Sequence, residues 1–253
     1  MITKDQIKNL SKTFQIDEFS IFREYLQLVF LSYLYQEKYA NKIFFKGGTA
    51  LRLLFGSPRF SEDLDFSTSY SDLEITKFMK KIEKKLNREL QGLTINPLHK
   101  GEDGIRFRII FKNAEFKYPF SIRLDFHRQK SIMNTQISTF INTQISTLTT
   151  QFPIIIFPQI SHLSGEGILI EKFEALETRK KGRDIFDIWF LLSKGIKTNK
   201  YVKSKDFENK TIKSLKVFPE TTLKKDLGRF LPRVQRQIIP SLKKETMRLL
   251  LQG

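Results

Sequence analysis

Apolar residues recur at helical spacing in two stretches of the chain. Between residues 18 and 38 they form one stripe, which predicts an amphipathic helix with Asp17 or Ser20 as its N-cap. Residues 72–90 show the same spacing among many charged residues and predict a second helix with its apolar side turned inward. Both helices are expected to pack on a common core.

Alternating patterns predict strands at two further places. Residues 105–111 alternate apolar residues with arginines and predict a strand with one basic face. Residues 120–126 alternate in the same way, so Arg123 and Asp125 point away from the core. A short apolar run at residues 154–157, between two prolines, predicts a buried strand.

Residues 134–149 contain an eight-residue duplication, NTQISTFI followed by NTQISTLT. Neither copy holds enough apolar residues to pack as an independent unit, and two copies are too few for a solenoid. We interpret this segment as an insertion or a pair of exposed turns.

Residues 43–66 combine apolar runs typical of strands with helical spacing, and they predict a strand, a tight turn, a helix and a second strand. The turn contains Gly47 and Gly48, followed by Thr49. Glycine lets backbone N–H groups approach a phosphate without an intervening Cβ, and the helix N-terminus adds favourable partial charge. The segment therefore predicts a triphosphate cradle, although a glycine pair taken alone most often forms only a turn.

Two aspartates follow this helix. Asp63 and Asp65 are two residues apart, so on a strand both carboxylates project to the same face. Adjacent carboxylates suit Mg²⁺, whereas such a pair taken alone is most often solvated at an edge or in a loop. If the strand at residues 120–126 lies beside this one, Asp125 supplies a third carboxylate. The alternative for Asp125 is an ion pair with Arg123 or Arg106.

The stretches KGGTAL and RFSEDLDF, in this order, resemble the nucleotidyltransferase signature and, more narrowly, the AbiEii/AbiGii toxin family of toxin–antitoxin systems. Residues 168–192 resemble two later motifs of that family and predict two helices broken at Gly182, with Asp184 able to cap the second. On this match Lys172 would contact the nucleotide phosphates and Asp187 would help to position the reacting group. From the residues alone, a solvated Lys172 and ion pairing of Asp184 and Asp187 with Arg179 and Arg183 remain alternatives.

The resemblance implies a fold and its partners. The fold class would be α/β (α+β), a nucleotidyltransferase-like mixed sheet with a helical N-terminal flank and a helical C-terminal half. We expect a nucleotidyltransferase-like domain over residues 1–160 and a helical, basic region over residues 161–253. Mg²⁺ would be the cofactor, an NTP the co-substrate, and a cognate antitoxin protein a partner.

The resemblance also assigns roles to individual residues. In this chemistry carboxylate-held metal ions polarise the α-phosphate, while a cationic side chain offsets charge on the departing pyrophosphate. The expected catalytic residues are Asp63, Asp65, Lys172 and Asp187; the metal ligands are Asp63, Asp65 and Asp125; and the nucleotide-binding residues are Gly47, Gly48, Thr49, Lys172 and, as a weaker candidate, Arg59.

The chain is strongly basic. It has 44 Lys and Arg against 27 Asp and Glu, a formal net charge of +17, and the excess is concentrated after residue 196. Such an excess attracts polyanions, so we expect RNA as a partner. With the family resemblance, the 3′ end of tRNA becomes the expected acceptor and blocked translation the result. A lysine-rich composition without a nucleic-acid role is the alternative.

Other features limit the function classes. The absence of Cys excludes disulfides, thiolate catalysis and cysteine metal sites. His99, His127 and His162 lack ligand spacing and are interpreted as loop or core residues. No signal peptide or apolar span is evident, so we expect a cytoplasmic protein with no membrane partner. Transfer to a small-molecule or protein hydroxyl, and a non-catalytic nucleotide- or RNA-binding module, remain alternative functions.

Overall fold

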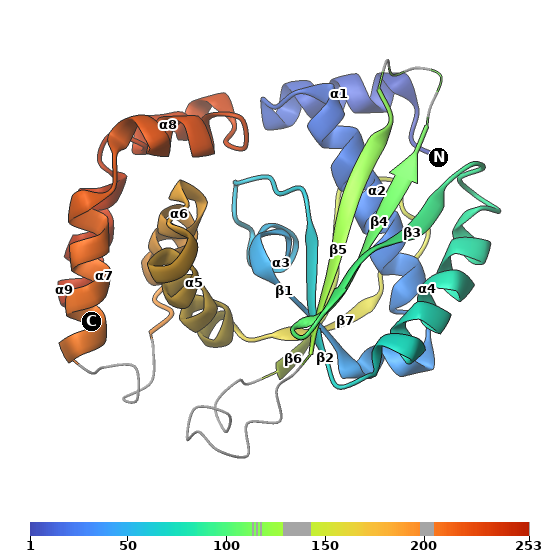
Figure 1. Ribbon diagram of the computed structural model, residues 1–253. Coiled ribbons are helices and arrows are strands. Elements are labelled where there is room, and N and C mark those ends of the chain that lie inside the picture. The colour runs from blue at the N-terminus through green and yellow to red at the C-terminus, as the bar shows by residue number, and fades with distance from the viewer. Residues whose placement is uncertain (113, 115, 117, 129–142, 198–204, 253) are drawn as a thin grey trace.

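A computed structural model describes residues 1–112, 114, 116, 118–128, 143–197 and 205–252. The described residues form a mixed sheet of seven strands in the order β3-β4-β5-β2-β1-β7-β6, with helices around it (Figure 1). The strands are β1 (Ile43–Lys46), β2 (Leu64–Thr68), β3 (Thr94–Gly101), β4 (Gly104–Phe111), β5 (Phe120–Arg128), β6 (Thr143–Thr147) and β7 (Gln159–Leu163). The helices are α1 (Lys4–Phe14), α2 (Glu18–Leu34), α3 (Gly47–Phe55), α4 (Asp72–Leu86), α5 (Gly165–Arg179), α6 (Gly182–Ser193), α7 (Lys205–Val217), α8 (Glu220–Gly228) and α9 (Leu242–Gln252), with 3-10 segments η1 (Lys38–Lys42) and η3 (Arg233–Ile238).

The two helices predicted from helical spacing are α2 and α4. Asp17 caps α2, since its Oδ1 accepts a hydrogen bond from the Ser20 backbone N–H at 2.8 Å. Ser71 and Glu74 form a capping box at the start of α4. Because α2 packs against α1, α4 and β5 at once, it is buried on more sides than a single apolar stripe predicts.

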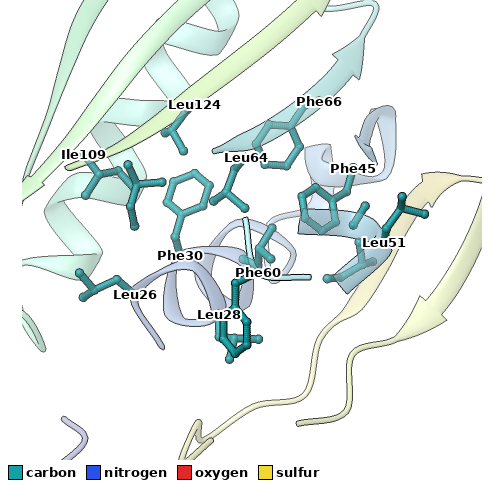
Figure 2. Packing of buried hydrophobic residues seen from close by; sticks show 14 of the residues in the cluster. Leu26, Leu28, Phe30, Phe45, Leu51, Phe60, Leu64, Phe66, Ile109 and Leu124 are labelled. Atoms are coloured by element: carbon teal, nitrogen blue, oxygen red, sulfur yellow. The ribbon is translucent and has the colours of Figure 1, made fainter. Parts of the chain in front are cut away.

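The core lies between the sheet and the pair α2 and α4. Alternation along the strands sends Leu64, Phe66 and Leu124 to the buried face, where Phe30 of α2 meets them (Figure 2). The rings of Phe30 and Phe66 have centroids 6.4 Å apart. Burying one side chain of this size contributes about 1.5 to 3 kcal/mol to the stability of the fold, so packing on this face stabilises the sheet. The opposite face is left to polar side chains.

The C-terminal half is helical, as predicted. Figure 1 shows α5 to α9 grouped on one side of the molecule, across α3 from α2 and α4. Within this group α6 packs on α5, α8 and α9. Gly182 does begin α6, but Asp184 does not cap it by a side-chain hydrogen bond, because its carboxylate is bound to Arg179 instead.

The prediction of a buried strand at residues 154–157 is wrong. This segment is irregular, and Ile155 is 90% exposed. The flanking prolines lack an N–H for a strand ladder, which explains why an apolar run here does not pair. The buried strand of this region is β7, which pairs in parallel with β1 through Phe45 and His162.

The duplicated segment is also different from the prediction. Its second copy contains β6, an edge strand that pairs antiparallel with β7, rather than an exposed turn. The first copy lies outside the described residues. Two further elements, α1 and β3, were not predicted.

The α/β class and the mixed sheet are confirmed. The predicted division at residue 160 falls within β7, and the helical group follows from α5 onward. Two domains with this boundary stay a prediction. Among the described residues, no helix combines the length and apolar character needed to cross a membrane.

Candidate active site

The polar face of the sheet carries a row of charged side chains across four strands. The register pairs Asp65 of β2 with Lys46 of β1 on one side and with Asp125 of β5 on the other. Asp125 in turn pairs with Arg106 of β4. Because β2 and β5 run parallel and in register, two carboxylates that are sixty residues apart in sequence lie side by side. The prediction that these strands are neighbours is confirmed.

Asp125 is the more deeply buried of the two carboxylates. Only 4% of this residue is exposed, and its Oδ1 accepts no hydrogen bond from the described residues. Arg106 Nε lies 3.1 Å from Oδ1 without hydrogen-bond geometry, and Arg123 Nε lies 3.0 Å from Oδ2. Burial, followed by the charge of Asp65, raises the pKa of Asp125. A cation beside Asp65 and Asp125 would relieve this repulsion.

Asp63 stands just before β2, and its carboxylate is bound to Arg123. Its Oδ2 accepts a hydrogen bond from Arg123 at 2.7 Å. Burial raises the pKa of Asp63 to about 6; Arg123 opposes this rise, while Asp65 and Asp125 add to it. Arg123 therefore bridges Asp63 and Asp125, and all three carboxylates share one electrostatic environment.

The glycine turn touches this row directly. Gly47 has φ +78°, and a Cβ built on it would overlap Oδ2 of Asp65. Gly47 and Gly48 open α3, so the first N–H groups of that helix lie beside the carboxylates. The Thr49 hydroxyl is buried and donates to the backbone carbonyl of Asp63, which ties the turn to β2. Glycine is required here by both conformation and space.

A cleft of about 330 Å³ separates this face of the sheet from α5. The sheet side contributes Lys46, Asp65 and His127, and the helix side contributes Lys172 and Arg179. Further lining residues are Gly47, Glu171, Glu174, Ala175 and Thr178. Gly47 of the glycine turn, the carboxylate of Asp65 and three basic side chains therefore open onto one space, and Asp125 lies beside Asp65 on the neighbouring strand.

Lys172 enters the cleft from a buried network of charges. Its Nζ lies 2.7 Å from Oδ2 of Asp187 and 3.5 Å from Oδ1 of Asp184. Arg59 donates two hydrogen bonds of 2.8 Å to Asp187, and Arg179 binds Asp184 through two more of 2.9 and 2.6 Å. Burial alone would raise the pKa of Asp187, but Arg59 and Lys172 hold it below its usual value.

This network of charges holds the Lys172 side chain in place from the side that faces away from the cleft. Asp184 and Asp187 are fully buried, and Arg59 is 2% exposed and lies against Gly48. Lys172 is therefore not solvated. The alternative of an ion pair with Arg179 holds for Asp184, whereas Asp187 pairs with Arg59 and Lys172. Asp187 acts on the cleft through Lys172, and Arg59 lies behind the glycine turn.

The donor set fits a divalent cation. Oxygen atoms of Asp65 and Asp125 and a ring nitrogen of His127 all lie within 4.8 Å of one another. Asp125 presents an oxygen without a hydrogen-bond partner among the described residues, and Asp65 lies across the strand ladder from it. Carboxylate oxygens are the ligands that Mg²⁺ requires.

Most residues predicted from the sequence meet at this site, but several residues that line the cleft were not predicted. Gly47, Asp65 and Lys172 line the cleft. Asp187 and Arg59 lie behind Lys172 and Gly48, Thr49 is bonded to the Asp63 carbonyl, Asp125 pairs with Asp65 across the strand ladder, and Arg123 joins Asp63 to Asp125. Lys46 and His127 line the cleft as well. The alternation of β5 was the signal for His127, because it stands two residues after Asp125 and on the same face.

We expect Gly47→Ala to reduce nucleotide transfer by about a hundredfold, because its Cβ would force Asp65 out of position. Gly56→Ala is the matched control, since Gly56 has φ +75° but no atom within 4 Å of a Cβ. Both variants should lose about 1 kcal/mol of stability from the positive φ. Transfer assays with melting curves separate these effects, and full activity of Gly47→Ala would show that the close approach is dispensable.

A mixed sheet with paired carboxylates, a glycine turn and a lysine-bearing helix around one cleft has the features expected of a nucleotidyltransferase. A family model described as "Nucleotidyl transferase AbiEii toxin, Type IV TA system" matches residues 29–249. The chain therefore belongs to the AbiEii family of nucleotidyltransferase toxins, as the sequence motifs predicted. Membership implies an NTP substrate and an antitoxin partner.

Solved structures support the same fold. MenT4, a nucleotidyltransferase toxin from Mycobacterium tuberculosis, superposes with a TM-score of 0.66 at 17% identity, covering 100% of this chain and 91% of that one. JHP933 from Helicobacter pylori gives a TM-score of 0.57 at 18% identity, with 94% of each chain covered. At these identities the likeness concerns the fold. No curated protein sequence matches the chain.

Proposed function

We propose that the protein transfers a nucleotide from an NTP to the 3′ end of RNA, with tRNA as the acceptor and Mg²⁺ as the metal. The observation that supports this best is the parallel register that places Asp125 beside Asp65, which lies opposite Lys172 across the cleft. One wall offers ligands for a metal, and the other offers a fixed cation for phosphate. Blocked translation would follow from a modified tRNA end.

Each group has a distinct task in this proposal. Asp65 and Asp125, with Asp63 as the further expected ligand, would hold a metal ion that, when bound, would supply positive charge at the α-phosphate and lower the pKa of the attacking hydroxyl. Backbone N–H groups of the glycine turn bind the triphosphate at the N-terminus of α3. Lys172 stabilises the negative charge that develops on the departing pyrophosphate. Asp187 and Arg59 hold Lys172 and the turn in place.

A basic groove beside the cleft supports RNA as the acceptor. The groove has a volume of about 680 Å³ and lies between the end of α1 and η3. Arg229, Arg233, Arg236 and Lys12 line it, and Arg229 reaches Glu62, the residue before Asp63, at 3.3 Å. Arginine binds phosphate in a planar, bidentate manner. A strand in this groove would lead its end toward the carboxylates.

Incubation of the purified protein with each labelled NTP, Mg²⁺ and total RNA tests the proposal. Label in RNA, in the size range of tRNA, supports it. Label in protein would favour a protein hydroxyl as the acceptor. If Mg²⁺ is present and neither RNA nor protein becomes labelled, the result would favour a non-catalytic binding module. Omission of the metal should abolish incorporation, because the transferred phosphate then lacks its Lewis acid.

We expect the triple variant Arg229→Gln, Arg233→Gln and Arg236→Gln to weaken RNA binding similarly for all sequences. Each lost phosphate contact should reduce the salt dependence, log K against log[salt], by about 0.7 to 0.9. Binding assays over a salt series measure this change, while nucleotide binding in the cleft should remain.

Three exposed lysines of α4 provide the matched control, because their replacement removes the same charge from a helix that does not line the groove. These residues are Lys77, Lys80 and Lys84. If both triple variants change the salt slope equally, the groove has no special role. If only antitoxin binding is lost in the arginine variant, the groove is a protein docking surface instead.

A further inference from the structure

His127 is placed as a third donor at the carboxylate site. It follows Asp125 by two residues on β5, so both side chains project to the same face. Its ring and the carboxylates of Asp65 and Asp125 bring three ligand atoms within 4.8 Å of one another. All three residues lie on the strands β2 and β5 rather than in a loop, so the sheet fixes their positions.

The ring nitrogens of His127 are not used to stabilise the fold. Within the described residues, no hydrogen bond to either nitrogen is present, although the ring lies between charged neighbours. His162 provides the contrast, because its Nδ1 lies 2.7 Å from the Leu163 carbonyl oxygen and its Nε2 lies 2.9 Å from the Ser146 hydroxyl. His162 is a satisfied core histidine, whereas His127 presents its imidazole to the cleft.

Imidazole changes which metal such a site prefers. Mg²⁺ binds oxygen ligands and retains water in place of nitrogen, whereas Mn²⁺ accepts imidazole together with carboxylates. Asp125 Oδ1, which lacks a hydrogen-bond partner among the described residues, and Asp65 supply the oxygen ligands. A mixed nitrogen and oxygen donor set at this position therefore discriminates between the two ions.

We infer that His127 is a metal ligand and that it gives the site a preference for Mn²⁺ over Mg²⁺. This inference rests on the proposed function, since it uses the same carboxylate site. The chain would still work with Mg²⁺, but Mn²⁺ would bind more tightly through the additional nitrogen. His127, which lies outside the paired aspartate motif, therefore determines the preference of the site for Mn²⁺ over Mg²⁺.

Pulsed electron paramagnetic resonance of bound Mn²⁺ tests the inference without an activity assay. The wild-type protein should show coupling of the Mn²⁺ electron spin to a ¹⁴N nucleus, and labelling with ¹⁵N-histidine should replace this signal with that of ¹⁵N. The chain has three histidines, so His99→Gln serves as a matched control that keeps the coupling. His127→Gln should lose it.

Metal titrations provide a second measurement. His127→Gln should lower the Mn²⁺ affinity by at least about tenfold and change the Mg²⁺ affinity by less than about twofold, so the ratio of affinities falls. If His127→Gln does not fold, the ¹⁵N-histidine experiment on the wild-type chain still decides the question.

The outcomes separate this inference from the proposed function. If Mn²⁺ binds the wild-type protein, and Asp65→Asn abolishes that binding, but no histidine nitrogen couples to the metal, only the role of His127 is overturned. If Mn²⁺ does not bind at all, or binds equally well to Asp65→Asn, the proposed metal site itself is overturned, and the inference with it.

Discussion

Replacing Asp65 with asparagine is expected to reduce nucleotide transfer by about a thousandfold while the fold remains intact. Asn keeps the shape of the side chain but removes the charge that would hold a metal ion next to the α-phosphate, a contribution of several kcal/mol. Stability should hold or rise slightly, because the charge of Asp65 raises the pKa of both Asp63 and Asp125, and its removal relieves that repulsion. Transfer of labelled nucleotide and melting temperature measure the two effects.

Two comparisons make this result specific. Asp63→Asn should also abolish transfer, although its carboxylate is bound to Arg123, so the pair of variants shows whether both aspartates are required. Asp5→Asn, at an exposed position on α1, should leave transfer unchanged. Transfer near the wild-type rate in both Asp63→Asn and Asp65→Asn would mean that the metal site has been assigned to the wrong residues.

Strong periodicity made part of the fold predictable from the sequence. The helix α4 and the strands β4 and β5 each bury one regular set of residues, and the pattern marks them. The helix α2 shows the same spacing but is buried on more sides than the pattern predicts. The strand β3 lies at a sheet edge, contains Pro97 and exposes most of its residues, so alternation is absent. The strand β7 is buried on both faces and only five residues long.

The site was predictable to the extent that its chemistry is local in sequence. Gly47 and Asp65 belong to one motif, and the residues around Lys172 belong to another. What joins the motifs is tertiary structure: Arg59 and Asp187 are 128 positions apart and form a bidentate pair. The ligand position of His127 depends on which strand lies beside β2, and only the sheet order supplies that information.

Lys172→Ala is expected to reduce transfer by about a hundredfold with only a small loss of stability. Removal of the sole partner from a buried charge costs about 3 to 5 kcal/mol, but here both carboxylates keep a partner. Asp187 retains two hydrogen bonds from Arg59, and Asp184 retains two from Arg179. A hundredfold loss corresponds to about 2.7 kcal/mol of transition-state stabilisation, as expected for one lost electrostatic contact to the reacting phosphates.

Arg59→Met is the comparison that separates function from structure. It leaves Asp187 with Lys172 alone and removes the hydrogen bond to the Phe60 carbonyl, so its stability should fall by several times as much as that of Lys172→Ala. Purified variants compared by melting temperature and by single-turnover transfer show which loss dominates. If Lys172→Ala unfolds as easily as Arg59→Met and transfers at the wild-type rate while folded, Lys172 stabilises the helix pair and does not act on the phosphates.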